Sequence, residues 1–236
     1  MGKAFGNRQK KYKLVPGDDY PTAYSLTELL FSNQKKIGIK FDCNKTVWEP
    51  AAGDGHMVKV LKDKFNHVVS SDISHGYMEY EKGKLKESDG GYFCDFLNVE
   101  HEINNVDYII TNPPFSLADE FILRAKKYDP EIICFLLRTN YLSGQSRGNK
   151  GIYDGLAHVA VFDRMPDFRA PIREDGKFPT AMNVYAWFIW RRGWKKKADF
   201  TTIKCGEFCL KSKEMSDSYR RGLYEIIGYP KRKVKI

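Results

Sequence analysis

Short apolar runs separated by helical stretches constrain the fold of this chain more than any other feature. The runs at 46–48, 68–70 and 106–111 have the length of strands, and the run at 132–137 is apolar throughout. A continuously apolar strand is typical of the middle of a parallel sheet, because both of its faces are covered. The alternation of strands and helices predicts an α/β fold with a doubly wound, mostly parallel sheet.

The other predicted elements continue this alternation. Two helix starts have the spacing of a capping box, in which a serine precedes an acidic residue by three positions, namely Ser25 with Glu28 and Ser116 with Asp119. The remaining elements are helices over 56–65 and 116–127, strands at 91–94, 158–162 and 184–190, a hairpin after residue 198, and a helix over 217–227.

The predicted elements indicate one α/β domain with a basic segment at each end. Residues 1–19 are polar and basic and are interpreted as an N-terminal arm. Residues 20–195 form the domain, in which 141–183, rich in Gly, Pro, Arg and Asp, is interpreted as a substrate-facing insertion. Residues 196–236 form a basic C-terminal extension.

The basic residues are clustered, which bears on the class of partner. The net charge is +9, from 39 basic and 30 acidic residues. Clusters lie near the two ends of the chain and around Trp194, where Arg191, Arg192, Lys195, Lys196 and Lys197 gather. Such clusters suit a polyanion such as nucleic acid. Charge alone leaves a solvated surface equally open.

Composition predicts a globular protein of the cytoplasm. The sequence is 42% hydrophobic and 14% aromatic, which argues against disorder. It contains no apolar stretch of membrane-spanning length, and its first ten residues lack the apolar core of a signal peptide. The five cysteines are scattered, which favours reduced thiols. Cys205 and Cys209 lack a second ligand pair, so small apolar side chains are favoured there over a zinc site.

Unusual residues follow the first predicted strand, at the edge of the sheet where ligands bind in this kind of fold. The turn Glu49-Pro-Ala-Ala-Gly53-Asp54-Gly55 has small residues that allow a ligand to approach the backbone. Val58 stands where a dinucleotide-binding turn has its third glycine, so no pyrophosphate is implied. The carboxylates of Glu49 and Asp54 favour a cationic ligand with an amino-acid tail. The alternative is a generic strand-to-helix turn.

Carboxylates also end the next two strands. Asp72 follows the second strand, nineteen residues after Gly53, where it is placed to accept hydrogen bonds from ribose hydroxyls. Asp95 and Phe96 follow the third strand, where an acid beside an aromatic ring suits an adenine. The alternative for Asp72 is the cap of a helix.

The most specific motif is Asn112-Pro113-Pro114-Phe115, which ends the fourth strand. Two prolines fix the backbone and prevent a helix from starting there. The rigid turn presents the Asn112 side-chain oxygen and the Pro113 carbonyl as two acceptors, which suit an amino group with two hydrogens. Phe115 offers a stacking face for a planar ring. The alternative is a rigid turn with an Asn cap.

The order of these motifs resembles the class I S-adenosylmethionine-dependent methyltransferases, and within them the DNA adenine-N6 methyltransferases of phage and prophage type. The resemblance covers roughly residues 20–190 and includes the upstream segment that begins Tyr20-Pro21-Thr22. It implies a Rossmann-like fold with a seven-stranded sheet, S-adenosyl-L-methionine as cofactor, and DNA as partner, with RNA as the weaker option. The large target-recognition domain that many members carry has no counterpart here.

The resemblance implies a role for each matching residue. The cofactor would contact Tyr20, Pro21, Thr22, Glu49, Ala51, Gly53, Gly55, Asp72, Asp95, Phe96 and Asn112. The target base would be held by Asn112, Pro113, Pro114 and Phe115, and the substrate further by Arg164, Phe168, Lys195, Lys196 and Lys197. Similar motifs also occur in enzymes that methylate cytosine, RNA bases or protein glutamine. A non-catalytic nucleic-acid-binding protein that keeps the cofactor fold is the alternative of another class.

Overall fold

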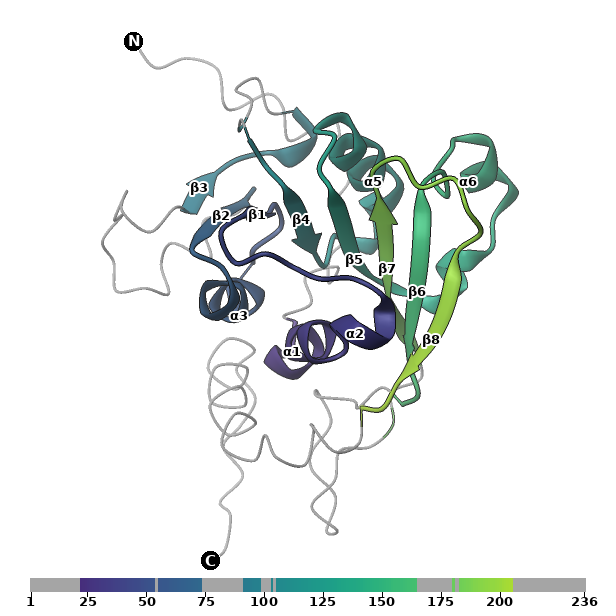
Figure 1. Ribbon diagram of the computed structural model, residues 1–236. Coiled ribbons are helices and arrows are strands. Elements are labelled where there is room, and N and C mark those ends of the chain that lie inside the picture. The colour runs from purple at the N-terminus through teal and green to yellow at the C-terminus, as the bar shows by residue number, and fades with distance from the viewer. Residues whose placement is uncertain are drawn as a thin grey trace, which may run out of the picture.

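An eight-stranded sheet forms the centre of the computed structural model, which describes residues 22–53, 55–73, 91–98, 103, 105–164, 180 and 183–205. The strand order is β3-β2-β1-β4-β5-β7-β6-β8 (Figure 1). The strands are β1 Thr46–Glu49, β2 His67–Asp72, β3 Gly91–Phe93, β4 Tyr108–Thr111, β5 Ile132–Arg138, β6 Leu156–Phe162, β7 Tyr185–Arg191 and β8 Asp199–Ile203.

The direction of the strands confirms the predicted mostly parallel sheet. β1 pairs in parallel with β2 and β4, β4 with β5, and β2 with β3. Only β7 runs antiparallel to its neighbours β5 and β6 among the described strands. β8 adds an eighth strand to the predicted seven, and it pairs in parallel with β6 at the edge of the sheet. The rest of the predicted hairpin and the predicted helix over 217–227 lie outside the described residues.

Helices cover both faces of the sheet. Figure 1 shows α1, α2 and α3 together on one side and α5 on the other. The described helices are α1 Tyr24–Ser32, α2 Gln34–Ile37, α3 His56–Lys64, α5 Ala118–Lys127 and α6 Gln145–Asn149, with short 3-10 turns η2 Phe96–Asn98, η3 Phe115–Leu117 and η4 Thr139–Leu142.

The alternation of side chains along β5 explains the two layers. Cys134 and Leu136 belong to the buried cluster that includes Leu30 of α1. Phe135 and Leu137, one position on, belong to the cluster that includes Ile122 of α5. Successive side chains of a strand point to opposite faces, so a strand that is apolar throughout must be covered on both. The prediction that 132–137 lies centrally is confirmed.

Both predicted capping boxes are wrong. No side chain caps α1, whose N-cap residue is Ala23, and Glu28 instead forms an ion pair of 3.1 Å with Lys64 of α3. No side chain caps α5 either, since its N-cap is Leu117 and Asp119 instead accepts hydrogen bonds from η4 and α6. In both cases the acidic side chain finds a partner on another element, which a pattern of local spacing does not include.

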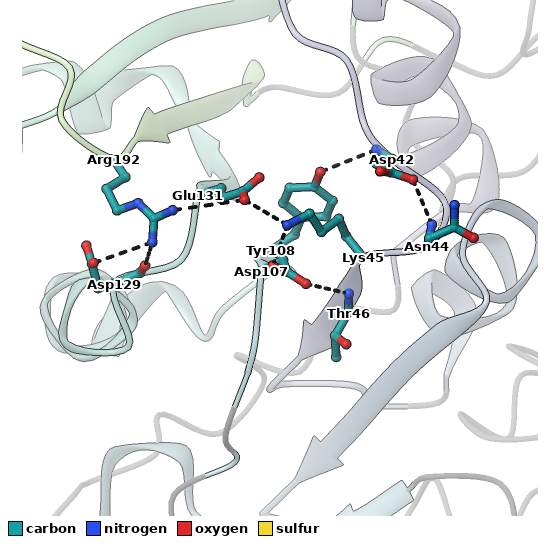
Figure 2. A network of polar contacts seen from close by, with 9 residues as sticks. All are labelled: Asp42, Asn44, Lys45, Thr46, Asp107, Tyr108, Asp129, Glu131 and Arg192. Carbon is teal, nitrogen blue, oxygen red and sulfur yellow. Dashed lines mark hydrogen bonds and ion pairs between the residues drawn. The ribbon is translucent and has the colours of Figure 1, made fainter.

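The amino ends of β1, β4 and β5 are joined by a network of charged side chains (Figure 2). Lys45 Nζ lies 3.1 Å from Asp107 and 2.9 Å from Glu131, and the hydrogen bonds to these two carboxylates raise the pKa of the lysine. Asp107 also accepts a 2.9 Å hydrogen bond from the backbone N–H of Thr46. Arg192, just after β7, extends the network to Asp129. This edge holds the strands in register and lies opposite the edge with the predicted site.

Candidate functional site

The carboxyl ends of β1 and β4 bring the two strongest predicted motifs together. These strands are neighbours at the centre of the sheet. After β1 the chain proceeds to β2 on one side, while after β4 it proceeds to β5 on the other. Loops that leave adjacent strands in opposite directions open a crevice between them, and this is where α/β sheets bind ligands.

Glu49 is a buried carboxyl at the end of β1. Its exposed fraction is 1%, and Oε1 accepts hydrogen bonds from Thr111 Oγ1 at 2.5 Å and from the backbone N–H of Ala51 at 3.2 Å. The other oxygen, Oε2, has no hydrogen-bond partner among the described residues. Burial raises the pKa of Glu49 to about 8, against the effect of the two hydrogen bonds. The carboxyl therefore keeps its proton at neutral pH in the unliganded protein, and a cation that reached Oε2 would favour its ionised form.

The glycines after β1 form a loop that Asp72 braces from β2. Gly53 and Gly55 have φ angles of +48° and +73°, in the left-handed region that residues with a Cβ rarely adopt. Asp72 Oδ2 accepts a 2.8 Å hydrogen bond from the Gly53 N–H. Ala51 follows Glu49 in the same turn and is half-buried. The structure thus brings together five of the predicted cofactor residues, Glu49 included, and Asp72 braces the loop whether or not it makes the predicted ribose contact.

Asp95 and Phe96 lie after β3 with different surroundings from those predicted. The carboxylate of Asp95 caps η2, since it accepts hydrogen bonds from the Leu97 N–H at 3.0 Å and from Asn98 Nδ2 at 2.6 Å. The Phe96 ring is only 2% exposed and packs edge-on against Trp48, with ring centroids 5.0 Å apart. Their contact with a cofactor adenine stays a prediction, and the burial of Phe96 favours packing in the core.

Asn112 is held by a residue ninety positions earlier. Its Nδ2 donates a 3.0 Å hydrogen bond to Thr22 Oγ1, and Thr22 is 9% exposed. The amide oxygen therefore faces away from Thr22, because the two ends of an amide point in different directions. Pro113 is buried, and Pro114 has φ −53° and ψ 125°, an extended conformation in which the chain leaves β4. The hydrogen bond to Thr22 thus orients the Asn112 amide at the carboxyl end of β4, and its role as an acceptor for an amino group stays a prediction.

Thr22 precedes α1, which is fixed to the sheet. Trp187 Nε1 on β7 donates a 3.0 Å hydrogen bond to the Leu26 carbonyl, and both residues are buried. At the start of α1, the Tyr24 ring lies edge-on against His56 of α3, with centroids 5.0 Å apart. Burial lowers the pKa of His56 to about 4, so its imidazole is neutral at physiological pH. Of the predicted upstream residues, Thr22 therefore contacts Asn112, whereas Tyr20 and Pro21 lie outside the described residues.

Phe115 is flanked by two residues that the sequence did not single out as site residues. The guanidinium carbon of Arg138, the last residue of β5, lies 4.6 Å from the centre of the Phe115 ring. The ring of Tyr185, the first residue of β7, has its centroid 5.7 Å from that of Phe115. Arg138 and Tyr185 are register partners in the antiparallel pair of β5 and β7. Both residues lie at the ends of predicted strands, and this position could have identified them as site candidates from the sequence.

The other predicted substrate residues are not gathered at Asn112. The exposed lysines 195–197 follow β7, whose last residue, Arg191, pairs with Ile132 at the start of β5. They therefore lie at the edge opposite Asn112, because β7 is antiparallel. Arg164 follows β6 at the same edge as Asn112, but three strands away, roughly 14 Å at the usual strand spacing. Phe168 lies outside the described residues.

No metal site or membrane span is found in the part of the chain that the structure describes. Within the described ranges no three His, Cys, Asp or Glu side chains gather as metal ligands would. Cys205 is buried, and Cys209 lies outside those ranges. None of the described helices combines the length and the apolar character that a membrane crossing requires.

Comparison with solved structures identifies the fold. The M protein of the type I restriction enzyme EcoKI is similar with a TM-score of 0.55 and 12% identity, over 80% of this chain and 49% of that one. A type I restriction-modification methyltransferase subunit from Streptococcus thermophilus is similar with a TM-score of 0.54 and 12% identity, over 85% and 52%. The chain has the Rossmann-like fold of the class I methyltransferases.

A third similar structure, the type IIG restriction endonuclease BpuSI, has a TM-score of 0.51 and 16% identity, over 77% of this chain and 26% of that one. This chain thus spans about half the length of the first two proteins and about a quarter of the third. The sequence matches no family model and no curated protein. The comparisons therefore establish the fold, and the chemistry must be argued from the site.

Proposed function

We propose that this protein is a methyltransferase that transfers a methyl group from S-adenosylmethionine to the exocyclic amino group of adenine in DNA. The observation that carries the proposal is the position of Asn112, which Thr22 orients at the end of β4, next to the loop of Glu49 and the two glycines after β1. An acceptor for an amino group and a carboxylate for a cationic amino acid then lie at the carboxyl ends of two neighbouring strands.

The residues after β1 fit this cofactor. Glu49 Oε2, buried and without a described partner, can accept a hydrogen bond from the ammonium group of the methionine part. Gly53 and Gly55 have no side chains that would obstruct the approach of the sulfonium or the ribose. When bound, S-adenosylmethionine supplies a methyl group that is already activated on a positively charged sulfur.

The contribution of the protein is then mainly orientation. The Asn112 oxygen and the Pro113 carbonyl would accept hydrogen bonds from the two N–H groups of the amine and free its lone pair from the ring. Orientation of this kind can contribute several kcal/mol to a reaction barrier. Phe115 would stack on the base and contribute roughly 1–3 kcal/mol of binding. No strong general base is required, because the amine becomes acidic as it gains the methyl group.

DNA is favoured as the substrate by two observations. The chain carries a net charge of +9, which suits a polyanion. The three similar structures described above are named as restriction or restriction-modification proteins. A base in a duplex would have to leave the stack to reach the crevice, at a cost of a few kcal/mol.

Transfer of a labelled methyl group tests the proposal. The protein is incubated with labelled S-adenosylmethionine and, in separate reactions, with DNA, RNA and a protein pool, and the labelled product is digested to identify the methylated unit. N6-methyladenine in DNA is the expected product. Label in cytosine, RNA or glutamine would show that the methylated substrate is that one and not adenine in DNA. Cofactor binding without transfer to any pool would instead support a non-catalytic nucleic-acid-binding protein.

A further inference from the structure

Arg138 is a half-buried cation at the edge of the sheet that carries Asn112, and none of the described acidic residues forms an ion pair with it. It ends β5, the strand next to β4. Within the described residues it forms a cation–π contact with Phe115, at 4.6 Å, and its Nε is buried with no hydrogen-bond partner.

Two other described arginines have the acidic partner that Arg138 lacks among the described residues. Arg147 Nε lies 3.2 Å from Asp119, and Arg192 reaches Asp129 at 3.5 Å. Burying a donor without a partner costs about 1–3 kcal/mol, and more for a charged group. The described residues therefore leave one buried donor of Arg138, Nε, without an acceptor, and the oxygen of an anionic ligand would supply one.

The position of the guanidinium narrows the kind of anion. It lies against the ring of Phe115, the residue proposed to stack on the target base. A nucleotide carries its phosphate one sugar away from its base, so a base on Phe115 brings a phosphate into the neighbourhood of Arg138. The planar fork of a guanidinium matches two phosphate oxygens. The glutamine side chain of a protein substrate carries no phosphate.

We propose that Arg138 binds a phosphate of the nucleotide whose base lies against Phe115, and so positions that base next to Asn112. Arg138 is then a substrate-positioning residue, and it distinguishes a nucleotide in a strand from a base without a phosphate. This inference rests on the proposed function, since it takes Phe115 as the surface that receives the base.

Binding of a short DNA strand, measured by fluorescence anisotropy at several salt concentrations, tests the assignment. Arg138→Met removes the charge, and Arg138→Gln removes it but keeps a planar, polar end group on a shorter side chain. Arg138→Lys keeps a point charge without the planar guanidinium. Arg192→Met is the matched control, since it removes an arginine from the opposite edge. Far-UV circular dichroism and thermal melting identify which variants are folded, and Arg138→Gln replaces Arg138→Met if the latter does not fold.

The neutral variants should bind DNA about 10–100-fold more weakly, in line with the loss of a charge-assisted hydrogen bond. Their slope of log affinity against log salt should fall by about 0.7–0.9, the value for one phosphate contact. Arg138→Lys should keep the slope, and Arg192→Met should resemble the wild type. In methyl transfer the neutral variants should show a raised KM with kcat changed much less.

Two different failures can be told apart. If the wild type methylates DNA and the neutral variants keep its salt slope and KM, Arg138 only packs against Phe115 and the phosphate assignment is overturned. If the wild type neither binds nor methylates nucleic acid, the proposed function fails, and the assignment fails with it.

Discussion

Replacing Glu49 with glutamine should remove a pH-dependent loss of stability from the unliganded protein. The carboxyl is 1% exposed, and burial raises its pKa from 4.5 to about 8. Between these pH values the folded protein keeps a proton that the unfolded chain has released. Stability of the wild type therefore falls as pH rises through this window, by up to about 1.4 kcal/mol per pH unit from this group. The loss of stability is complete above the pKa that Glu49 has in the folded protein, and it is absent below the pKa that this residue has in the unfolded chain.

The Glu49→Gln variant does not titrate, so the loss should disappear. The amide oxygen can still accept the hydrogen bond from Thr111, which Oε1 of the carboxyl accepts at 2.5 Å. The amide nitrogen then occupies the place of Oε2 without a described partner, at a cost of about 1–3 kcal/mol that does not depend on pH. The difference in free energy of unfolding between variant and wild type should therefore grow in favour of the variant from pH 5 to pH 8, by on the order of 2–4 kcal/mol.

Urea denaturation at pH 5, 6, 7 and 8 measures this difference. Glu120→Gln, which replaces an exposed carboxyl on α5, is the control and should show little dependence on pH. In calorimetry the Glu49→Gln variant should bind S-adenosylmethionine roughly 10–100-fold more weakly, because it loses a charge-assisted hydrogen bond. A stability difference that is the same at every pH would refute the reasoning about the buried carboxyl. Unchanged cofactor affinity would refute the role of Glu49 in the cofactor pocket.

Four further changes test the rest of the site. Asn112→Ala should lower methyl transfer at least about a hundredfold with little change in cofactor affinity, and near wild-type transfer by the folded variant would remove its catalytic role. Thr22→Val should lower transfer by about tenfold, since Asn112 loses the hydroxyl that orients it, while melting temperature shifts by only a few degrees. Asp72→Ala should weaken S-adenosylmethionine binding by about 1–3 kcal/mol, measured by calorimetry, as it removes both the predicted ribose acceptor and the partner of the Gly53 N–H. Replacing the lysines at 195–197 with alanine should leave methyl transfer to a short oligonucleotide unchanged, because these lysines lie at the edge of the sheet opposite Asn112. A tenfold rise in the KM for the oligonucleotide would contradict that placement.

The sequence by itself determined the fold class and the two central motifs. Strand and helix periodicity is local, and an apolar run such as 132–137 requires burial on both faces in any arrangement. The turn after β1 and the Asn-Pro-Pro-Phe turn are also local, because glycine and proline restrict or permit backbone angles on their own. The order of these motifs along a parallel sheet was sufficient to place Glu49 and Asn112 at one edge.

Only the tertiary structure decided which side chains meet across long stretches of sequence. Thr22 orients Asn112 from ninety residues away, and Arg138 reaches Phe115 because β5 lies beside β4. The antiparallel direction of β7 separates the lysines at 195–197 from the site, although their charge and the nearby tryptophan made them candidates. The burial of Phe96 likewise follows from the packing of α5 against β1 and not from its neighbours in sequence. Contacts of this kind depend on strand order and direction, which the spacing of residues along the chain does not encode.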